Sequence, residues 1–301
     1  MDVNFPFLGF LSILSHFEKW QYLNVSYDWL LEIGMNPDQP ALSYSFKNSS
    51  FEKNNAVTVV IPAYNEEDRI LPILEGLVKS DEVVQVLVIF DGNDRTPEVA
   101  SSFGNKVKVF SYPAKLGRGG AIIEGLKLAN SKVITFADAD NAAPWYEVLR
   151  LSKMVTNNTP CVIGSRYTKD AKLLKRESYF KILAGRIWHY FIFLFLGLKY
   201  KDVQCGLKCF SRDLLKEVLP SVTITNRLFD VDLLFNIERK GFKITEVGIE
   251  YVHNSDSRMP YLHMIPIMFL YLFGIRIAHS NIGAHFKSHL KLASNKLNRI
   301  H

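Results

Sequence analysis

The chain has 301 residues, of which 48% are hydrophobic, with a formal net charge of +6 at pH 7 and three cysteines. This composition supports a folded chain with a sizeable core, and three cysteines are too few for a disulfide-stapled secreted scaffold, so we expect reduced thiols in a cytosolic compartment. The positive charge indicates an anionic partner: nucleic acid, a phosphorylated substrate or anionic lipid.

Residues 1–55 are predicted to form a helical extension and a linker. Residues 1–35 are rich in Phe, Leu and Trp, as in short amphipathic helices, and residues 36–55 are rich in Pro, Ser and Asn, which favour turns. The apolar run Phe5–Leu14 follows Asp2 where a signal peptide would carry basic residues, and it is too short to span a membrane.

Strands and helices are predicted to alternate from residue 57 onward. Short apolar runs typical of strands buried on both faces occur at Val57–Ile61, Val86–Phe90, Val107–Phe110, Val133–Ala137 and Cys161–Ile163. Residues 67–79 and 119–129 are predicted to be helices, the first from its helical stripe of apolar residues. This order predicts an α/β fold with a mostly parallel sheet covered by helices on both faces.

Chemically distinctive motifs follow four of these strands. They are Pro62-Ala63-Tyr64-Asn65-Glu66-Glu67, Asp91-Gly92, Lys115-Leu-Gly117-Arg118-Gly-Gly120 and Asp138-Ala139-Asp140. Ligands of such sheets bind beyond the carboxyl ends of the strands. We therefore expect the four motifs to meet at one edge.

The pair Asp138 and Asp140 suggests a divalent cation holding a nucleotide diphosphate, because Mg²⁺ typically takes one or two carboxylates plus substrate phosphates. Taken alone, the pair also fits a loop or helix cap before Pro144. Tyr64 is suited to stack on a base and Glu66 to accept hydrogen bonds from base or ribose, although acidic residues also favour a helix start.

The remaining two motifs have similar alternatives. Asp91 is a candidate acceptor for a base N–H group, or an ordinary turn residue. The cations Lys115 and Arg118 could balance a diphosphate at a helix N-terminus, although the motif is not a P-loop and also fits a plain glycine turn.

The second half of the chain combines basic and apolar segments. After Arg166 come the basic residues Lys169, Lys172, Lys175, Arg176, Lys181 and Arg186. They fit a solvated face or a site for an anionic headgroup. Residues 187–198 and 259–278 are very apolar; interfacial or re-entrant helices are favoured over a membrane span, a soluble core or an oligomer interface. The acid-free basic tail, residues 281–301, suits an anionic membrane surface, and no nucleic-acid reader module accompanies it.

In combination these motifs resemble family 2 glycosyltransferases from Val57 to Arg258, and within them the enzymes that transfer a hexose to dolichyl or another polyprenyl phosphate. The resemblance is carried by Val60-Ile-Pro-Ala-Tyr-Asn-Glu-Glu67, Asp138-Ala-Asp140, Gly164-Ser-Arg-Tyr167, Asp202-Val-Gln-Cys-Gly-Leu-Lys208 and Phe229-Asp-Val-Asp-Leu-Leu234. It implies a Rossmann-like GT-A domain over residues 56–258, including an interface helix near 176–198, with residues 259–301 as an apolar helix and tail. It also implies Mg²⁺ or Mn²⁺ and inversion at C1 of a sugar donated by UDP-glucose or, next, GDP-mannose.

The resemblance also implies roles for individual residues. The nucleotide would contact Pro62, Ala63, Tyr64, Glu66, Asp91, Lys115, Gly117, Arg118, Asp138 and Ala139, and the metal Asp140 with Asp138. The acceptor phosphate would contact Arg166 and Arg176, the sugar Gln204, Gly206 and Asp230, and the diphosphate Arg258. The catalytic set would be Asp140, Arg166, Lys208 and Asp232. One departure is Phe90-Asp91-Gly92-Asn93 in place of the usual Asp-Asp-Gly-Ser.

A phosphate acceptor makes chemical sense of these residues, since a phosphate monoester is largely dianionic at pH 7 and needs no general base. If Asp230 or Asp232 acted as a base, a hydroxyl of a lipid-linked glycan or another lipid would become the rival acceptor; nucleotidyl transfer and a non-enzymatic membrane-binding protein are weaker alternatives. We expect a peripheral or monotopic protein on the cytoplasmic face of a membrane, with homo-oligomers through the apolar helices as a further possibility.

Overall fold

The computed structural model describes residues 56–174, 179–226, 228–252, 269, 271–276 and 279, with only the backbone of residues 179–182. The predictions for residues 1–55, for Arg176 and Arg258, for the tail 281–301 and for most of 259–278 lie outside these residues.

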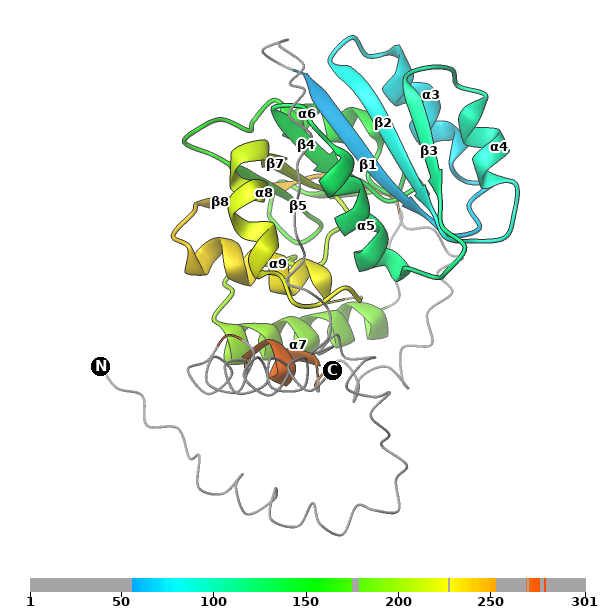
Figure 1. Ribbon diagram of the computed structural model, residues 1–301. Helices are drawn as coiled ribbons and strands as arrows, with labels where there is room; N and C mark the ends of the chain where they lie inside the picture. Colours follow the sequence, from blue (N-terminus) through cyan, green and yellow to red (C-terminus); the bar gives the residue numbers. More distant parts are fainter. Residues whose placement is uncertain are drawn as a thin grey trace, which may run out of the picture.

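A seven-stranded sheet forms the centre of the described domain, in the order β3-β2-β1-β4-β7-β5-β8 (Figure 1). Its strands are β1 (Val57–Ala63), β2 (Val83–Phe90), β3 (Val107–Ser111), β4 (Val133–Phe136), β5 (Cys161–Ser165), β7 (Lys208–Ser211) and β8 (Ile244–Gly248). Only β7 runs antiparallel to its neighbours. The predicted mostly parallel sheet is confirmed.

Helices cover both faces of this sheet. One layer holds α3 (Leu71–Lys79), α4 (Thr96–Ser101) and α6 (Trp145–Ser152); the other holds α5 (Gly117–Leu128), α7 (Tyr179–Leu196), α8 (Arg212–Val218), the 3₁₀ turn η2 (Leu219–Ser221) and α9 (Phe229–Arg239). Because strand side chains alternate, β1 sends Val59 and Ile61 into the first layer and Val60 into the second. A Cβ at Gly125 would lie 2.2 Å from Val60 Cγ1, so a glycine lets α5 pack directly on β1.

The strand predictions agree with the structure within a few residues, but one helix boundary was wrong. The predicted helix 67–79 begins only at Leu71. Before it, Thr96 Oγ1 accepts a hydrogen bond from Glu66 N (2.9 Å) and Asp94 Oδ2 accepts one from Glu67 N (3.0 Å). Because these side chains, distant in sequence, accept hydrogen bonds from the backbone N–H groups of the turn, residues 66 and 67 stay outside the helix, which begins later than predicted.

Helix α7 lies beneath α9 at one end of the domain (Figure 1). Its inner side buries Ile192 and Leu196. Phe269 packs on it, with ring centroids 4.5 Å from Phe191 and 5.7 Å from Trp188. Its outer side, here called the exposed α7 face, carries Leu183, Ile187, Tyr190, Phe193 and Leu194. Among the described residues, no helix is long and apolar enough to cross a bilayer.

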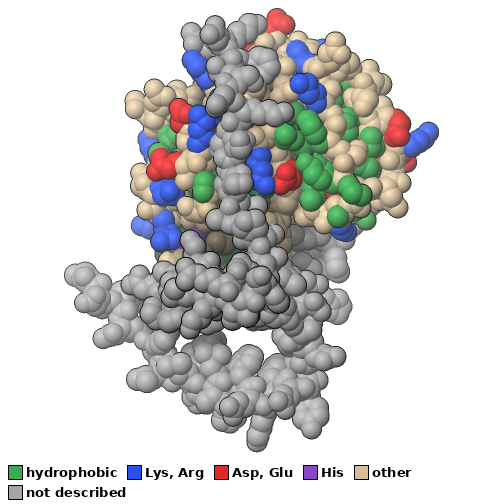
Figure 2. All heavy atoms as spheres, in the orientation of Figure 1, with side chains coloured by type: hydrophobic (Ala, Val, Ile, Leu, Met, Phe, Trp, Pro, Cys, Tyr) green, Lys and Arg blue, Asp and Glu red, His purple; other side chains and the backbone are tan. Residues whose placement is uncertain are grey.

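A two-stranded parallel ribbon lies beside the main sheet. It pairs β6 (Lys172–Leu173) with β9 (Glu250–Tyr251), and Lys172 forms an ion pair with Glu250. On the face shown in Figure 2, Lys and Arg side chains are scattered among acidic ones, while hydrophobic side chains gather over β2 and β3. The described part of that face therefore presents no continuous basic stripe.

Candidate active site

Asp91, at the end of β2, fixes the start of α5. Its Oδ2 accepts hydrogen bonds from the backbone N–H groups of Leu116 and Gly117, each 2.8 Å long. These N–H groups belong to the helix N-terminus, where an acceptor is needed. Asp91 therefore links the motif after β2 to the motif after β3. Its predicted contact with a nucleotide base stays a prediction.

Tyr64, after β1, is 44% exposed, and Lys115 Nζ lies 4.2 Å from the centroid of its ring. The two motifs predicted to bind a nucleotide thus meet at one edge, as expected from parallel strands. An exposed aromatic face with an ammonium group beside it is suited to a base and an anionic group on the same ligand.

The turn after β4 takes an uncommon backbone conformation. Asn141 has φ of 54°, in the left-handed region, and its Oδ1 accepts a hydrogen bond from the N–H of Trp145, the first residue of α6. Asp140 Oδ1 accepts one from Ala142 N at 3.1 Å. Pro144 is the N-cap residue of α6 rather than part of its first turn, and Asn141, not either aspartate, accepts the hydrogen bond from the first helical N–H. Such strained turns cluster at functional sites.

Four charged side chains form what we call the carboxylate cluster: Arg118, Asp138, Lys208 and Asp230. Arg118 Nε donates to Asp138 Oδ1 (3.0 Å) and its Nη1 to Asp230 Oδ2 (2.6 Å). The fully buried Lys208 Nζ donates to Asp230 Oδ1 (3.0 Å) and to the carbonyl of Cys205 (2.7 Å). The end of β4, the start of α5, β7 and α9 therefore converge on one point.

The formal charges of the four groups cancel, but Asp230 pairs with both cations and Asp138 with Arg118 alone. Burial raises the pKa of the Asp138 carboxyl, Arg118 opposes the rise, and Asp140 and Asp230 add to it. Burial alone would also raise the pKa of Asp230, but Arg118 and Lys208 outweigh it and hold that pKa below its usual value. The side of the cluster at Asp138 thus favours additional positive charge.

Asp138 and Asp140 fit a divalent cation. No group of three or more His, Cys, Asp or Glu side chains that could hold a metal occurs among the described residues. A pair of carboxylates is nevertheless sufficient for a hard cation that takes its other ligands from substrate phosphates and water. A Cβ at residue 206 would lie 1.9 Å from Asp138 Oδ2, so Gly206 leaves the space that this carboxylate occupies.

Arg166, after β5, is held by partners inside the protein. Its Nε and Nη2 donate to the two carboxylate oxygens of Asp202 at 2.7 and 2.9 Å, and its backbone N–H also donates to Asp202 Oδ2. Its guanidinium carbon lies 5.3 Å from the ring centroids of both Tyr167 and Tyr251. The predicted contact of Arg166 with an acceptor phosphate remains a prediction; the structure shows a bidentate ion pair between two rings.

Helix α7 borders the same site. Trp188 Nε1 donates to Oε1 of Gln204 at 2.7 Å, two residues before Gly206. A Cβ at Gly185 would lie 3.7 Å from the hydroxyl oxygen of Tyr167. The apolar helix is thus linked directly to the loop that packs against Asp138.

Asp232 has different neighbours from Asp230, because side chains two positions apart on a helix point to different faces. Its Oδ2 accepts from Thr223 N (2.6 Å), Thr223 Oγ1 (3.1 Å) and Ile224 N (3.0 Å). Its Oδ1 pairs with Asn236 Nδ2 and His279 Nε2, each at 2.9 Å. The structure therefore does not bring Asp232 together with the other predicted catalytic residues.

Tyr251 and Asp202 belong to the site but received no role from the sequence. Burial raises the pKa of the Tyr251 phenol, and the charges of Asp138 and Asp140 raise it further while Arg166 opposes them. Tyr251 sits on a strand of two residues, which carries no readable pattern. Asp202 stood in a recognised motif, but only its contact with Arg166 defines its role.

Residues 58–219 match the model of "Glycosyl transferase family 2". The chain belongs to glycosyltransferase family 2. Similar curated proteins include two dolichyl-phosphate beta-glucosyltransferases. The one from Homo sapiens is 29% identical over 67% of this chain and 69% of its own length, and the one from Dictyostelium discoideum is 26% identical over 90% of this chain and 91% of its own length.

Solved structures share the fold of this family 2 glycosyltransferase. Glucosyl-3-phosphoglycerate synthase from Mycobacterium tuberculosis, in complex with Mn²⁺, UDP-glucose and phosphoglyceric acid, superimposes with a TM-score of 0.59 at 19% identity, covering 74% of this chain and 80% of that one. Its complex with UDP gives a TM-score of 0.57 at 20% identity. The chain is thus a glycosyltransferase with a GT-A-like domain.

Proposed function

We propose that this family 2 glycosyltransferase transfers glucose from UDP-glucose, with inversion at C1, to the phosphate of dolichol or another polyprenol. The relatives named dolichyl-phosphate beta-glucosyltransferase support the glucosyl group and the acceptor. The structural neighbour crystallised with Mn²⁺ and UDP-glucose supports the donor and a divalent cation.

The observation that carries this proposal is the attachment of an exposed apolar helix to the carboxylate cluster. Trp188 of α7 binds Gln204, and the same loop continues through Gly206, which packs on Asp138. A soluble acceptor would give no reason to expose large apolar side chains beside the site. An acceptor phosphate carried on a lipid gives that reason, since the enzyme must then contact the bilayer.

The ends of β1, β2 and β4 with the start of α5 form what we call the donor half of the site, which in this proposal supplies nucleotide contacts and charge. In this proposal Tyr64 stacks on the base, and Lys115, with Asp91 holding the start of α5, lies beside the phosphates. Asp140 and Asp138 would hold Mg²⁺ or Mn²⁺, which supplies positive charge to the leaving diphosphate. Arg118, bound to Asp138 and Asp230, is the protein's own cation at that point.

The rest of the site, around Arg166, Gln204 and Lys208, is here called the acceptor half. In this proposal it orients an acceptor phosphate that is already ionised and does not have to deprotonate it. The second pKa of a phosphate monoester is about 6, so the acceptor is largely dianionic at pH 7. Its attack on the sugar therefore depends on cations that position it more than on a general base. The two carboxylates of α9 agree with this: Asp230 is neutralised by Arg118 and Lys208, and Asp232 accepts hydrogen bonds on both oxygens. These contacts support an acceptor that needs no general base.

We further propose that the exposed α7 face rests on the cytoplasmic surface of a membrane. The face is one-sided: Leu183, Ile187, Tyr190 and Leu194 recur at helical spacing, while Ile192 and Leu196 point into the core. Such a helix lies in the interface rather than across it.

Transfer of labelled glucose by the full-length chain, with Mn²⁺, tests this function. We expect product with a short polyprenyl phosphate and none with the matching polyprenol. Equal or preferential transfer to the polyprenol would contradict the proposal and would favour a hydroxyl acceptor. Release of pyrophosphate instead of UDP would indicate nucleotidyl transfer.

A further inference from the structure

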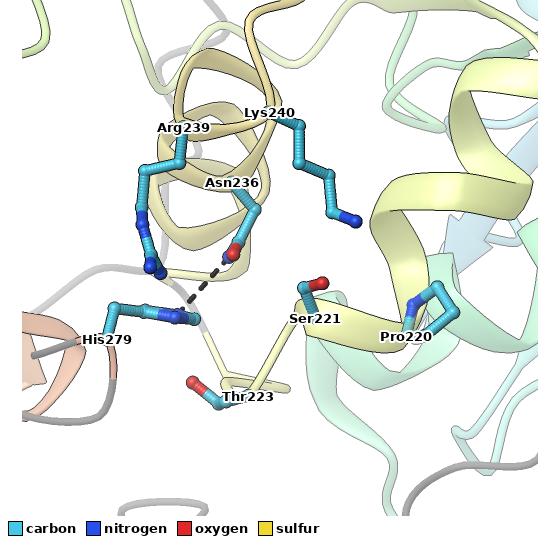
Figure 3. A pocket seen from close by; sticks show the side chains of 7 residues that line it. All are labelled: Pro220, Ser221, Thr223, Asn236, Arg239, Lys240 and His279. Carbon is cyan, nitrogen blue, oxygen red and sulfur yellow. Dashed lines mark hydrogen bonds between the residues drawn. The ribbon is translucent and has the colours of Figure 1, made fainter. Parts of the chain in front are cut away.

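A cavity lies at the end of α9, lined by two partners of Asp232, Thr223 and His279 (Figure 3). Its volume is about 340 Å³. Small-molecule sites span roughly 300–1,000 Å³, so this cavity has room for more than a bare ion. Its polar lining consists of Ser221, Thr223, Asn236, Arg239, Lys240 and His279.

The cavity is rich in positive charge. Arg239 and Lys240, at the end of α9, extend along its walls in Figure 3. Both side chains are exposed, and within the described part of the chain neither forms an ion pair; the guanidinium carbon of Arg239 lies 5.8 Å from the ring centroid of Phe235. None of the described lining residues is acidic. A helix C-terminus favours cations, which accounts for their presence, but not for the polar groups on the opposite wall.

The opposite wall is built from hydrogen-bonding groups held in place by Asp232. Asp232 accepts from Thr223 and pairs with His279, whose side chain is 7% exposed. Asn236 also contacts both Asp232 and His279. Both oxygens of Asp232 accept hydrogen bonds from these partners and its side chain is fully buried, so it presents no carboxylate oxygen to the cavity.

We propose that this cavity binds a phosphoryl group attached to a small organic moiety, at a site separate from the active site. Arg and Lys provide charge-assisted hydrogen bonds to phosphate oxygens, and the hydroxyl of Ser221 stands on the facing wall as a further donor, whereas the hydroxyl of Thr223 already donates to Asp232. The ligand could be an anionic phospholipid headgroup or a soluble phosphate ester.

The neighbourhood of the cavity favours the lipid source. His279 follows the segment that contains Phe269, Leu272 and Ile275, and its N–H donates to the carbonyl of Ile275. Phe269 packs on Phe191 of α7. One wall of the cavity is therefore continuous with the segment that packs against α7. This proposal does not depend on the identity of the sugar or of the catalytic acceptor.

The test compares two double variants of the full-length chain. Arg239→Gln/Lys240→Gln removes the two cavity cations. The matched control, Lys79→Gln/Lys108→Gln, removes two exposed cations elsewhere, of which Lys79 also lies in the last turn of a helix. One arm measures binding of glycerol 3-phosphate by calorimetry with saturating UDP and Mn²⁺ present. The other measures co-sedimentation with phosphatidylcholine vesicles that contain phosphatidic acid.

We expect the cavity variant to weaken binding about tenfold or more in at least one arm, since each tenfold change corresponds to about 1.4 kcal/mol, and the control to bind as the unmodified chain does. Loss in the vesicle arm alone identifies a lipid headgroup, and loss in the glycerol 3-phosphate arm alone a soluble ester. Equal binding by the two variants in both arms would overturn the proposal. Thermal unfolding of both variants checks that these exposed substitutions leave the fold intact.

Discussion

The two halves of the active site are held together in different ways. In the donor half, which comprises the ends of β1, β2 and β4 with the start of α5, each motif follows its own strand and the sheet brings the motifs together. In the acceptor half, the decisive contacts are ion pairs and hydrogen bonds between side chains of different segments: Arg166 with Asp202, Trp188 with Gln204 and Lys208 with Asp230.

The two halves should therefore respond differently to substitution. In the donor half, removing Asp140, which accepts a hydrogen bond from Ala142 within its own turn, should change chemistry and leave the fold intact. Removing an acceptor-side partner leaves a buried or half-buried charge behind, so it should change stability first.

The largest expected effect comes from Asp140→Asn in the donor half. Loss of a metal-binding carboxylate should lower kcat by about 1,000-fold, because charge stabilisation of the leaving group by a cation is worth several kcal/mol. The midpoint of thermal unfolding should stay unchanged. Glucose transfer and calorimetry measure the two quantities.

The control is Asp81→Asn, an exposed carboxylate just before β2, at the opposite edge of the sheet. It should retain full activity. Unchanged turnover in Asp140→Asn would remove this residue from the metal site.

The next largest effect is on stability in the acceptor half. Asp202→Asn leaves Arg166 without its bidentate partner, and the free energy of unfolding should fall by about 3 kcal/mol. Denaturation in urea measures this change. In the matched control, Asp213→Asn, the carboxylate is 94% exposed and pairs with Lys216 at 3.5 Å, so little change is expected.

A different outcome would redefine the role of Arg166. If the Asp202→Asn variant kept its stability but had a higher KM for polyprenyl phosphate, Arg166 would be a direct ligand of the acceptor phosphate. Its role would then not be the structural one of an ion pair packed between Tyr167 and Tyr251. The contrast between the two halves would then fail at this residue.

Gly206→Ala tests the contact between the two halves. Its Cβ would overlap Asp138 Oδ2, so the carboxylate has to move. We expect transfer to fall by about 30-fold, since small displacements of catalytic groups cost up to about 100-fold. Gly185→Ala, whose Cβ would make an ordinary contact at 3.7 Å, is the control and should remain active.

The smallest effect concerns the exposed α7 face. Ile187→Ser with Leu194→Ser should lower transfer to polyprenyl phosphate in vesicles about tenfold, because less apolar surface enters the interface. Transfer to a short acceptor in detergent should not change. Leu71→Ser, which alters a 40% exposed leucine on α3, is the control. Equal losses in vesicles and detergent would argue against a membrane-facing role.

The sequence predicted for a physical reason that the strand-end motifs of the donor half meet at one edge of the sheet. Strands buried on both faces are continuous apolar runs, and the residues directly after them must lie at one edge of a parallel sheet. The acceptor half offered no such rule. The four-residue β7 and the two-residue β9 are too short to show a pattern.

Side-chain partners were also beyond the reach of the sequence. The sequence did not show the neighbours of Asp230 and Asp232; only the register of α9 sends one to the carboxylate cluster and the other to Thr223 and His279. Nor did it show that Arg118 lies between Asp138 and Asp230, and the contact of Arg118 with the phosphates stays a prediction. Both outcomes depend on packing between segments distant in the chain.

The most direct test of the account is a crystal structure of the full-length chain with UDP and Mn²⁺. We predict an anomalous manganese signal beside the carboxylates of Asp138 and Asp140, with the base of UDP on the Tyr64 side of the same edge. A manganese and nucleotide site elsewhere on the molecule, with that edge unchanged, would contradict it.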